Sequence, residues 1–121
     1  MKAFLILAHG SRRARSNEEV IQLAECFGLQ NKQDYPIVRA AFMELAEPKI
    51  PDTIDAVLAA GATELIILPY FLAAGAHVVT DIPEILHSAL ADKPDVRFKV
   101  LPHIGGAKGM IQLIEQVTSE A

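Results

Sequence analysis

Residues 3–8, Ala-Phe-Leu-Ile-Leu-Ala, form an unbroken apolar run that leads directly into His9-Gly10-Ser11. Residues 65–68, Leu-Ile-Ile-Leu, form a second run of the same kind. Short, continuous apolar runs are typical of parallel strands that are buried on both faces. Residues 37–42 and 96–101 are two further strand candidates, so the sequence predicts four strands.

Apolar residues at helical spacing follow each predicted strand. The four apolar faces are Val20, Leu23, Ala24 and Phe27; Ile50, Ile54, Val57 and Leu58; Ile82, Ile85, Leu86 and Ala89; and Met110, Leu113, Ile114 and Val117. Ser16 with Glu19, and Asp81 with Glu84, are predicted capping pairs, and Gly61 is expected to end the second helix. The repeated strand–helix order predicts an α/β three-layer sandwich, with a four-stranded parallel sheet covered by helices on both faces.

Composition limits the classes of protein to which the chain can belong. It has 121 residues, a net charge of -4 and 21% charged residues, with no basic tail or stripe. This argues against a nucleic-acid surface and against long disorder. Cys26 is the only cysteine, so the chain has no disulfide pair and no thiolate metal cage. The apolar start is too short for a membrane span and lacks a signal-peptide pattern, which favours a cytoplasmic protein.

Three of the four histidines are predicted at one edge of the sheet. His9 follows the first strand, His77 lies in the loop after the third and His103 follows the fourth, whereas His87 falls inside a helix. Ligands of open parallel sheets bind outside the carboxyl ends of the strands. Neutral imidazole binds borderline divalent metals and takes up protons near neutral pH. The edge is therefore predicted to support metal and proton chemistry, and His87 is expected to be a solvated helix residue.

An apolar loop and charged groups accompany these histidines. Residues 69–77, PYFLAAGAH, are small and apolar, which favours a wall for an apolar ring system. Glu44 follows the second strand and is as consistent with a surface carboxylate as with a site residue. The arginines within residues 12–15 either meet an anionic substrate or form a solvated cluster. Ser11 lacks a GxSxG context and is expected to be a turn or cap residue.

These residues leave several functions open. A carrier of a metal or of an apolar ring system would use the same edge without turnover. A histidine phosphatase also carries His-Gly after its first strand, but it needs an arginine before the histidine, where this chain has Ala8. A flavodoxin-like or nucleotide-binding domain is supported only by the fold and by the glycines of residues 105–109, which lack P-loop spacing.

Three motifs in chain order are similar to those of the small sirohydrochlorin chelatases of the CbiX type. They are His9-Gly10-Ser11-Arg12 after the first strand, residues 42–48 (FMELAEP), and residues 69–78 (PYFLAAGAHV) with Asp81-Ile82-Pro83. The resemblance covers residues 2–83 closely and continues more weakly to the end. It implies a chelatase-like fold, a flavodoxin-like half unit, with residues 1–121 forming a single domain of this kind.

The family implies a lyase that inserts a divalent metal into sirohydrochlorin without ATP, in cobalamin or sirohaem biosynthesis. Cobalt is the expected ion, with iron or nickel as alternatives; the ion is a substrate, and no permanently bound cofactor is expected. His9 and His77 match the metal-binding histidines, with His9 also the proton acceptor, and Glu44 matches a carboxylate that contacts substrate or metal. These three are the catalytic set that the resemblance implies.

The substrate contacts follow from the same resemblance. The residues matching the tetrapyrrole-lining loop are Leu72, Ala73, Ala74, Gly75 and Ala76, and Ser11 and Arg12 are also assigned to substrate binding. Longer relatives carry two such units in one chain, so a homodimer with its cleft near the subunit interface is expected here, with no nucleic-acid or membrane partner. Residues 101–106, LPHIGG, depart from the turn expected there, so His103 either adds a ligand or occupies the turn.

Overall fold

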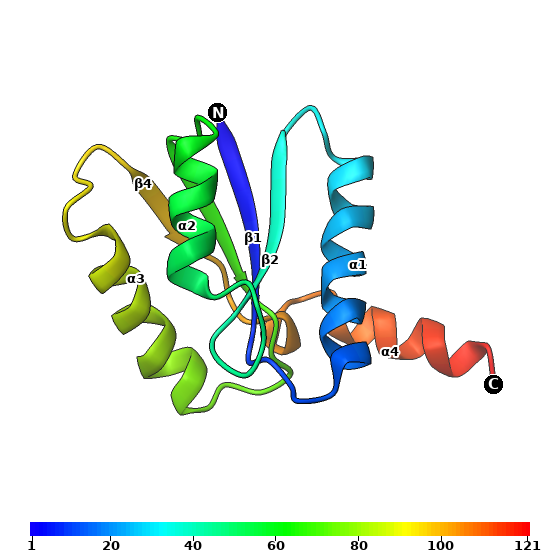
Figure 1. Ribbon diagram of the computed structural model, residues 1–121. Coiled ribbons are helices and arrows are strands. Elements are labelled where there is room, and N and C mark those ends of the chain that lie inside the picture. Colours follow the sequence, from blue (N-terminus) through cyan, green and yellow to red (C-terminus); the bar gives the residue numbers. More distant parts are fainter.

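The computed structural model describes residues 1–121, and its centre is the four-stranded parallel sheet that the sequence predicts. The strands are β1 (Lys2–Ala8), β2 (Ile37–Phe42), β3 (Glu64–Pro69) and β4 (Arg97–Val100), in the order β2-β1-β3-β4. β1 therefore lies between β2 and β3, with Ala3 opposite both Ile37 and Leu65. Because all pairings are parallel, β1, β2 and β3 end at the same edge of the sheet (Figure 1).

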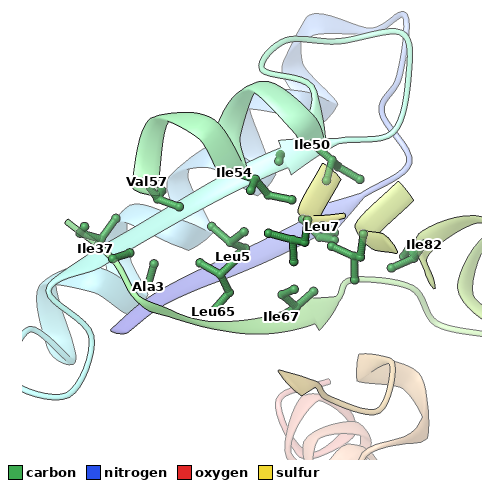
Figure 2. Close-up of a cluster of buried hydrophobic side chains, with 14 residues drawn as sticks. Ala3, Leu5, Leu7, Ile37, Ile50, Ile54, Val57, Leu65, Ile67 and Ile82 are labelled. Carbon is green, nitrogen blue, oxygen red and sulfur yellow. The ribbon is translucent and has the colours of Figure 1, made fainter. Parts of the chain in front are cut away.

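Helices cover both faces of the sheet at β1, β2 and β3, as predicted, whereas β4 is exposed at every position. Ala3, Leu5 and Leu7 of β1 point to one side, where they pack in a buried cluster with α2 (Ile50–Ala59) and α3 (Ile82–Leu90) (Figure 2). Phe4 and Ile6 point to the other side and pack with Ala24 of α1 (Ala14–Gln30). Burial on both faces explains why β1 is apolar at every position from 3 to 8.

The start of α1 differs from the predicted capping box. The helix begins at Ala14 with Arg13 at the N-cap, and the Ser16 N–H already bonds to the Arg13 carbonyl at 3.1 Å. Ser16 is thus inside the first turn and cannot cap it. Asn17 instead holds the preceding turn, because its side chain accepts from Ser11 N at 2.9 Å and donates to Ser11 O at 2.7 Å.

The capping pair predicted at Asp81 is also wrong, because the helical backbone begins earlier. A π-helical turn, η1 (His77–Asp81), runs directly into α3. Asp81 has helical dihedral angles of φ -69 and ψ -44 and makes no capping hydrogen bond. His77 therefore opens a helical segment, rather than lying in a loop as predicted. At the end of α2 the prediction holds, since Gly61 has the positive φ of 108 that favours glycine.

The last helix exists as predicted but covers nothing in this chain. After the short turn η2 (Ile104–Gly106), α4 (Met110–Ser119) has no buried residue. Its apolar side chains Ile111, Leu113, Ile114 and Val117 are 52–65% exposed. Figure 1 shows α4 extending away from the sheet toward the C-terminus.

Two further observations concern the chain as a whole. None of its helices has the length and apolar character needed to cross a membrane. Cys26, the lone cysteine, lies exposed on α1.

Truncation of the central strand tests the buried cluster. Leu5 is fully buried, so Leu5→Ala should lower the free energy of unfolding by about 3 kcal/mol through lost burial and a residual cavity. Leu29→Ala is the matched control, because Leu29 is 67% exposed on α1 and its truncation should cost little. Urea unfolding followed by circular dichroism compares the two. Equal losses would contradict the described core.

Candidate functional site

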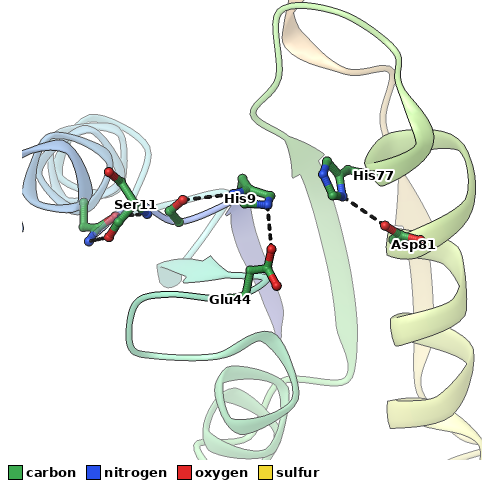
Figure 3. A network of polar contacts seen from close by, with 7 residues as sticks. His9, Ser11, Glu44, His77 and Asp81 are labelled. Atoms are coloured by element: carbon green, nitrogen blue, oxygen red, sulfur yellow. Dashed lines mark hydrogen bonds and ion pairs between the residues drawn. The ribbon is translucent and has the colours of Figure 1, made fainter. Parts of the chain in front are cut away.

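His9 lies at the end of β1, and both of its ring nitrogens have partners. Nδ1 lies 3.0 Å from the Gly10 carbonyl oxygen. Since a carbonyl only accepts, Nδ1 carries a proton and donates it. Nε2 lies 2.9 Å from Glu44 Oε1 (Figure 3). The side of the ring that faces the site therefore presents Nε2, with a carboxylate already beside it.

Glu44 reaches His9 because the segment after β2 stays pinned to β1. Met43 N donates to Ala8 O and Glu44 N donates to His9 O, both at 3.0 Å. Gly10 makes this close approach feasible: its φ is 97, and a Cβ there would lie 1.8 Å from the Glu44 carbonyl oxygen. The glycine after His9 is thus required both by its own backbone and by the neighbouring loop.

His77 comes from the other side of β1 and faces His9. The two ring centroids are 4.6 Å apart, with an angle of 54° between the ring planes. His77 Nδ1 lies 2.9 Å from Asp81 Oδ2, one turn further along η1 (Figure 3). The expectation that the two histidines meet at the sheet edge is therefore confirmed.

The site is open to solvent. The side chains of His9, Glu44 and His77 are 35%, 59% and 48% exposed. No group of three His, Cys, Asp or Glu side chains closes around a common point. The nearby Glu47 is occupied elsewhere: Lys49 Nζ donates to it at 3.0 Å and holds its pKa below the usual range. The arrangement is a pair of imidazoles with one carboxylate, which suits an ion that must be both bound and released.

The apolar segment from Leu72 to Ala76 lies exposed next to the histidines in the chain, and Leu72 is 78% exposed. The start of this segment contacts Gly105, a residue to which the sequence alone assigned no contact. Gly105 N donates to Phe71 O at 3.0 Å, and a Cβ on Gly105 would lie 1.8 Å from the Leu72 carbonyl oxygen. A glycine within the unexplained LPHIGG turn was the only available signal for this contact.

The remaining histidines take structural positions. His103 lies against Gly106, where a Cβ would be 2.7 Å from the His103 Cε1 atom. His103 therefore packs within the turn, and the alternative that it adds a ligand stays a prediction. His87 is exposed on α3, as predicted, and its ring lies edge-on to Phe98 at 6.4 Å.

The residues that follow His9 have two roles: Ser11 stabilises the turn, and the arginines carry unpaired positive charge. Ser11 Oγ accepts from Arg13 N at 3.0 Å, so the turn role expected for Ser11 is observed. Arg12, Arg13 and Arg15 are exposed and form no ion pair with the chain's carboxylates. Their charge is available to an external anion. Substrate binding by Ser11 and Arg12 stays a prediction.

Comparison with known proteins decides the family. The model of the CbiX family matches residues 3–121. The chain belongs to the CbiX family. A curated relative, the sirohydrochlorin cobaltochelatase of Methanococcus aeolicus, is 48% identical over 86 residues. That match covers 71% of this chain and 59% of the relative, so the matched part of the chain spans less than two thirds of the relative's length.

Solved structures extend the CbiX comparison to the fold. A CbiX protein from Marinobacter aquaeolei superposes with a TM-score of 0.84 at 29% identity, covering 99% of this chain and 93% of that one. SirB from Bacillus subtilis with Fe3+ superposes with a TM-score of 0.79 at 28% identity, covering 98% of this chain but only 46% of SirB. The four-stranded arrangement is thus shared with CbiX and SirB proteins.

Adding one methyl group at Gly10 tests how the site is assembled. Gly10→Ala should lower the free energy of unfolding by about 1–3 kcal/mol from backbone strain, with a further loss from the clash with Glu44. Gly109→Ala is the control, because nothing lies within 4 Å of a Cβ there. A crystal structure of the Gly10 variant should show Glu44 displaced from His9. An undisturbed 2.9 Å contact would contradict this assembly.

Proposed function

We propose that this chain catalyses ATP-independent insertion of a divalent metal, cobalt in the first place, into sirohydrochlorin. The observation that carries the proposal is the His9–His77 pair, 4.6 Å between ring centroids, with Glu44 at 2.9 Å from His9 Nε2. Membership of the CbiX family and the relative named sirohydrochlorin cobaltochelatase support it. Residues 1–121 act as one unit of this kind in the proposal.

The two imidazoles hold the incoming ion. Nitrogens bound to one ion at about 2.1 Å each lie about 3–4 Å apart, a separation that small rotations of the two facing rings can reach. Two neutral nitrogens and one carboxylate leave coordination positions free for the ring nitrogens of the substrate. The exposed side of the site gives the macrocycle access to the ion.

Charge and proton balance assign further roles to His9 and Glu44. Insertion of M2+ into the macrocycle forms metal–nitrogen bonds and displaces two pyrrole protons. As the ion transfers to the ring nitrogens, the lone pair of His9 Nε2 becomes free and takes one proton. Glu44, in contact with the same nitrogen, is placed to take the other. The two residues thereby exchange a bound cation for protons without a redox step.

The macrocycle lies against the exposed Leu72–Ala76 segment in this proposal. That segment, Leu72, Ala73, Ala74, Gly75 and Ala76, offers an apolar surface directly before His77. Arg12 and its neighbouring arginines have no carboxylate partner within the chain and pair with the carboxylates of the substrate. No permanently bound cofactor is needed for these steps.

Cobalt, iron and nickel all suit imidazole and carboxylate ligands, so the choice of ion follows supply as well as geometry. The relative named as a cobaltochelatase favours cobalt, and the SirB structure with Fe3+ keeps iron as an alternative. A carrier that binds metal or tetrapyrrole without turnover would use the same residues. Acceleration of insertion over the spontaneous rate separates the enzyme from the carrier. A cytoplasmic location stays a prediction from the sequence.

A second copy of the chain covers α4 in the proposed assembly. The apolar side chains of α4 are more than half exposed, an arrangement that favours association. This chain covers only 46% of SirB, which therefore carries about as much chain again. In the proposed homodimer, the second copy of the chain takes the place of the additional half of SirB, and the site lies near the subunit interface.

Removal of the His9 ring tests the activity. His9→Ala should abolish most acceleration of cobalt insertion, because both a metal ligand and the proton acceptor are lost. The measurement follows the absorbance change of sirohydrochlorin anaerobically with Co2+, against the spontaneous rate. His87→Ala is the matched control, an exposed histidine outside the site that should leave the rate unchanged. A wild-type rate in the His9 variant would exclude the proposed role, and tight binding without acceleration by wild type would identify a carrier.

A charge on the apolar side of α4 tests the assembly. Sedimentation velocity of the wild type should give twice the 13.1 kDa chain mass, and Ile114→Glu should give the single-chain mass. Gln116→Glu, which adds the same charge at a polar position of α4, should remain dimeric. Circular dichroism verifies that both variants are folded. A wild type that sediments as one chain would rule out the dimer.

A further inference from the structure

Asp81 makes a contact that the proposed function has not used. Its Oδ2 lies 2.9 Å from Nδ1 of His77. Both residues belong to the π-helical turn η1, which begins at His77 and ends at Asp81. Asp81 makes no capping hydrogen bond with the α3 backbone. Its carboxylate is therefore directed at the histidine rather than at the helix end.

This contact determines which nitrogen of His77 carries the proton. An ionised carboxylate only accepts hydrogen bonds, so Nδ1 must be the donor. In the neutral ring Nε2 then carries the lone pair. Figure 3 shows Asp81 below the His77 ring on η1, with the ring lying between it and His9.

Both histidines carry a proton on Nδ1, but the group that accepts the hydrogen bond from Nδ1 differs between them. His9 Nδ1 donates to the neutral carbonyl of Gly10 at 3.0 Å, whereas His77 Nδ1 donates to a carboxylate. Both rings consequently direct Nε2 toward the site, where Glu44 Oε1 already lies 2.9 Å from that of His9. Only His77 has negative charge placed directly behind it, which makes its Nε2 the more strongly donating of the two.

We propose that Asp81 is a positioning residue that fixes the tautomer and orientation of His77, so that Nε2 faces an ion held with His9. The inference rests on the proposed function, because it assigns Asp81 to the same metal site. His77 is 48% exposed, so packing alone leaves its ring free to turn. Carboxylates that accept from the second nitrogen of a metal-binding histidine typically contribute 10–100-fold to metal affinity.

The tautomer itself gives a test that needs neither metal nor substrate. The ¹⁵N shifts of His77, measured on the metal-free protein with the ring neutral, should show protonated Nδ1 in the wild type. In Asp81→Ala the proton should shift toward Nε2, whereas Asp81→Asn, which keeps an acceptor oxygen, should retain protonated Nδ1. A purely structural role for Asp81 would leave the tautomer of a folded Asp81→Ala variant unchanged, which would overturn the proposal.

Affinity for Co2+ alone gives the second test. Asp81→Ala should weaken Co2+ binding about 10–100-fold, and Asp81→Asn should recover part of the loss. Glu84→Ala is the matched control, because it removes an exposed carboxylate near the start of the same helix without touching His77. Absorption of the bound Co2+ reports both affinity and ligand geometry. Equal affinity of the wild type and Asp81→Ala would overturn the proposal.

A third variant separates this inference from the function on which it rests. His77→Ala should weaken Co2+ binding at least as strongly as Asp81→Ala. If His77→Ala weakens binding and Asp81→Ala does not, the positioning role fails while the metal site stands. If His77→Ala leaves the affinity unchanged, the proposed metal site itself fails, and the role of Asp81 fails with it.

Discussion

The backbone hydrogen-bond ladder of β1 continues beyond the end of the strand, and the whole site depends on it. Leu7 O accepts from Tyr70 N at 2.7 Å, Ala8 O accepts from Met43 N at 3.0 Å, and His9 O accepts from Glu44 N at 3.0 Å. These bonds hold the segments after β2 and β3 against the end of β1. Because β1 is the strand shared by both neighbours, residues 9, 44 and 77 come together although they are far apart in the chain.

The site that results is open, and its openness agrees with the proposed chemistry. A buried, closed ligand set would keep its metal, whereas a chelatase must transfer it. Here two half-exposed rings and one exposed carboxylate provide few ligands with free approach for a large macrocycle. Tight backbone packing at Gly10 and Gly105 supplies the rigidity that the exposed side chains lack, since each glycine touches a neighbouring carbonyl.

The sequence predicted the features that depend on burial and topology. Unbroken apolar runs located β1 and β3, the candidates at residues 37–42 and 96–101 proved to be β2 and β4, and the parallel arrangement then placed His9 and His77 at one edge.

Features that depend on which side chain bonds a particular backbone group were missed. Ser16 could not cap α1 because Asn17 anchors the preceding turn to Ser11 and the helix starts earlier. Asp81 resembled a cap, but its spacing of four from His77 also fits a contact within a helical turn, and that contact is the one formed. The exposure of α4 could not be predicted either. The same apolar pattern is expected whether the helix packs against the sheet or against another chain.

A crystal structure of the protein with bound Co2+, analysed by anomalous diffraction at the cobalt edge, would show whether the facing histidines bind the ion. One principal anomalous peak is expected between the facing rings of residues 9 and 77, within bonding distance of Nε2 of each, with the Glu44 carboxylate adjacent. A principal peak at His87 or His103, with none between the facing rings, would contradict it.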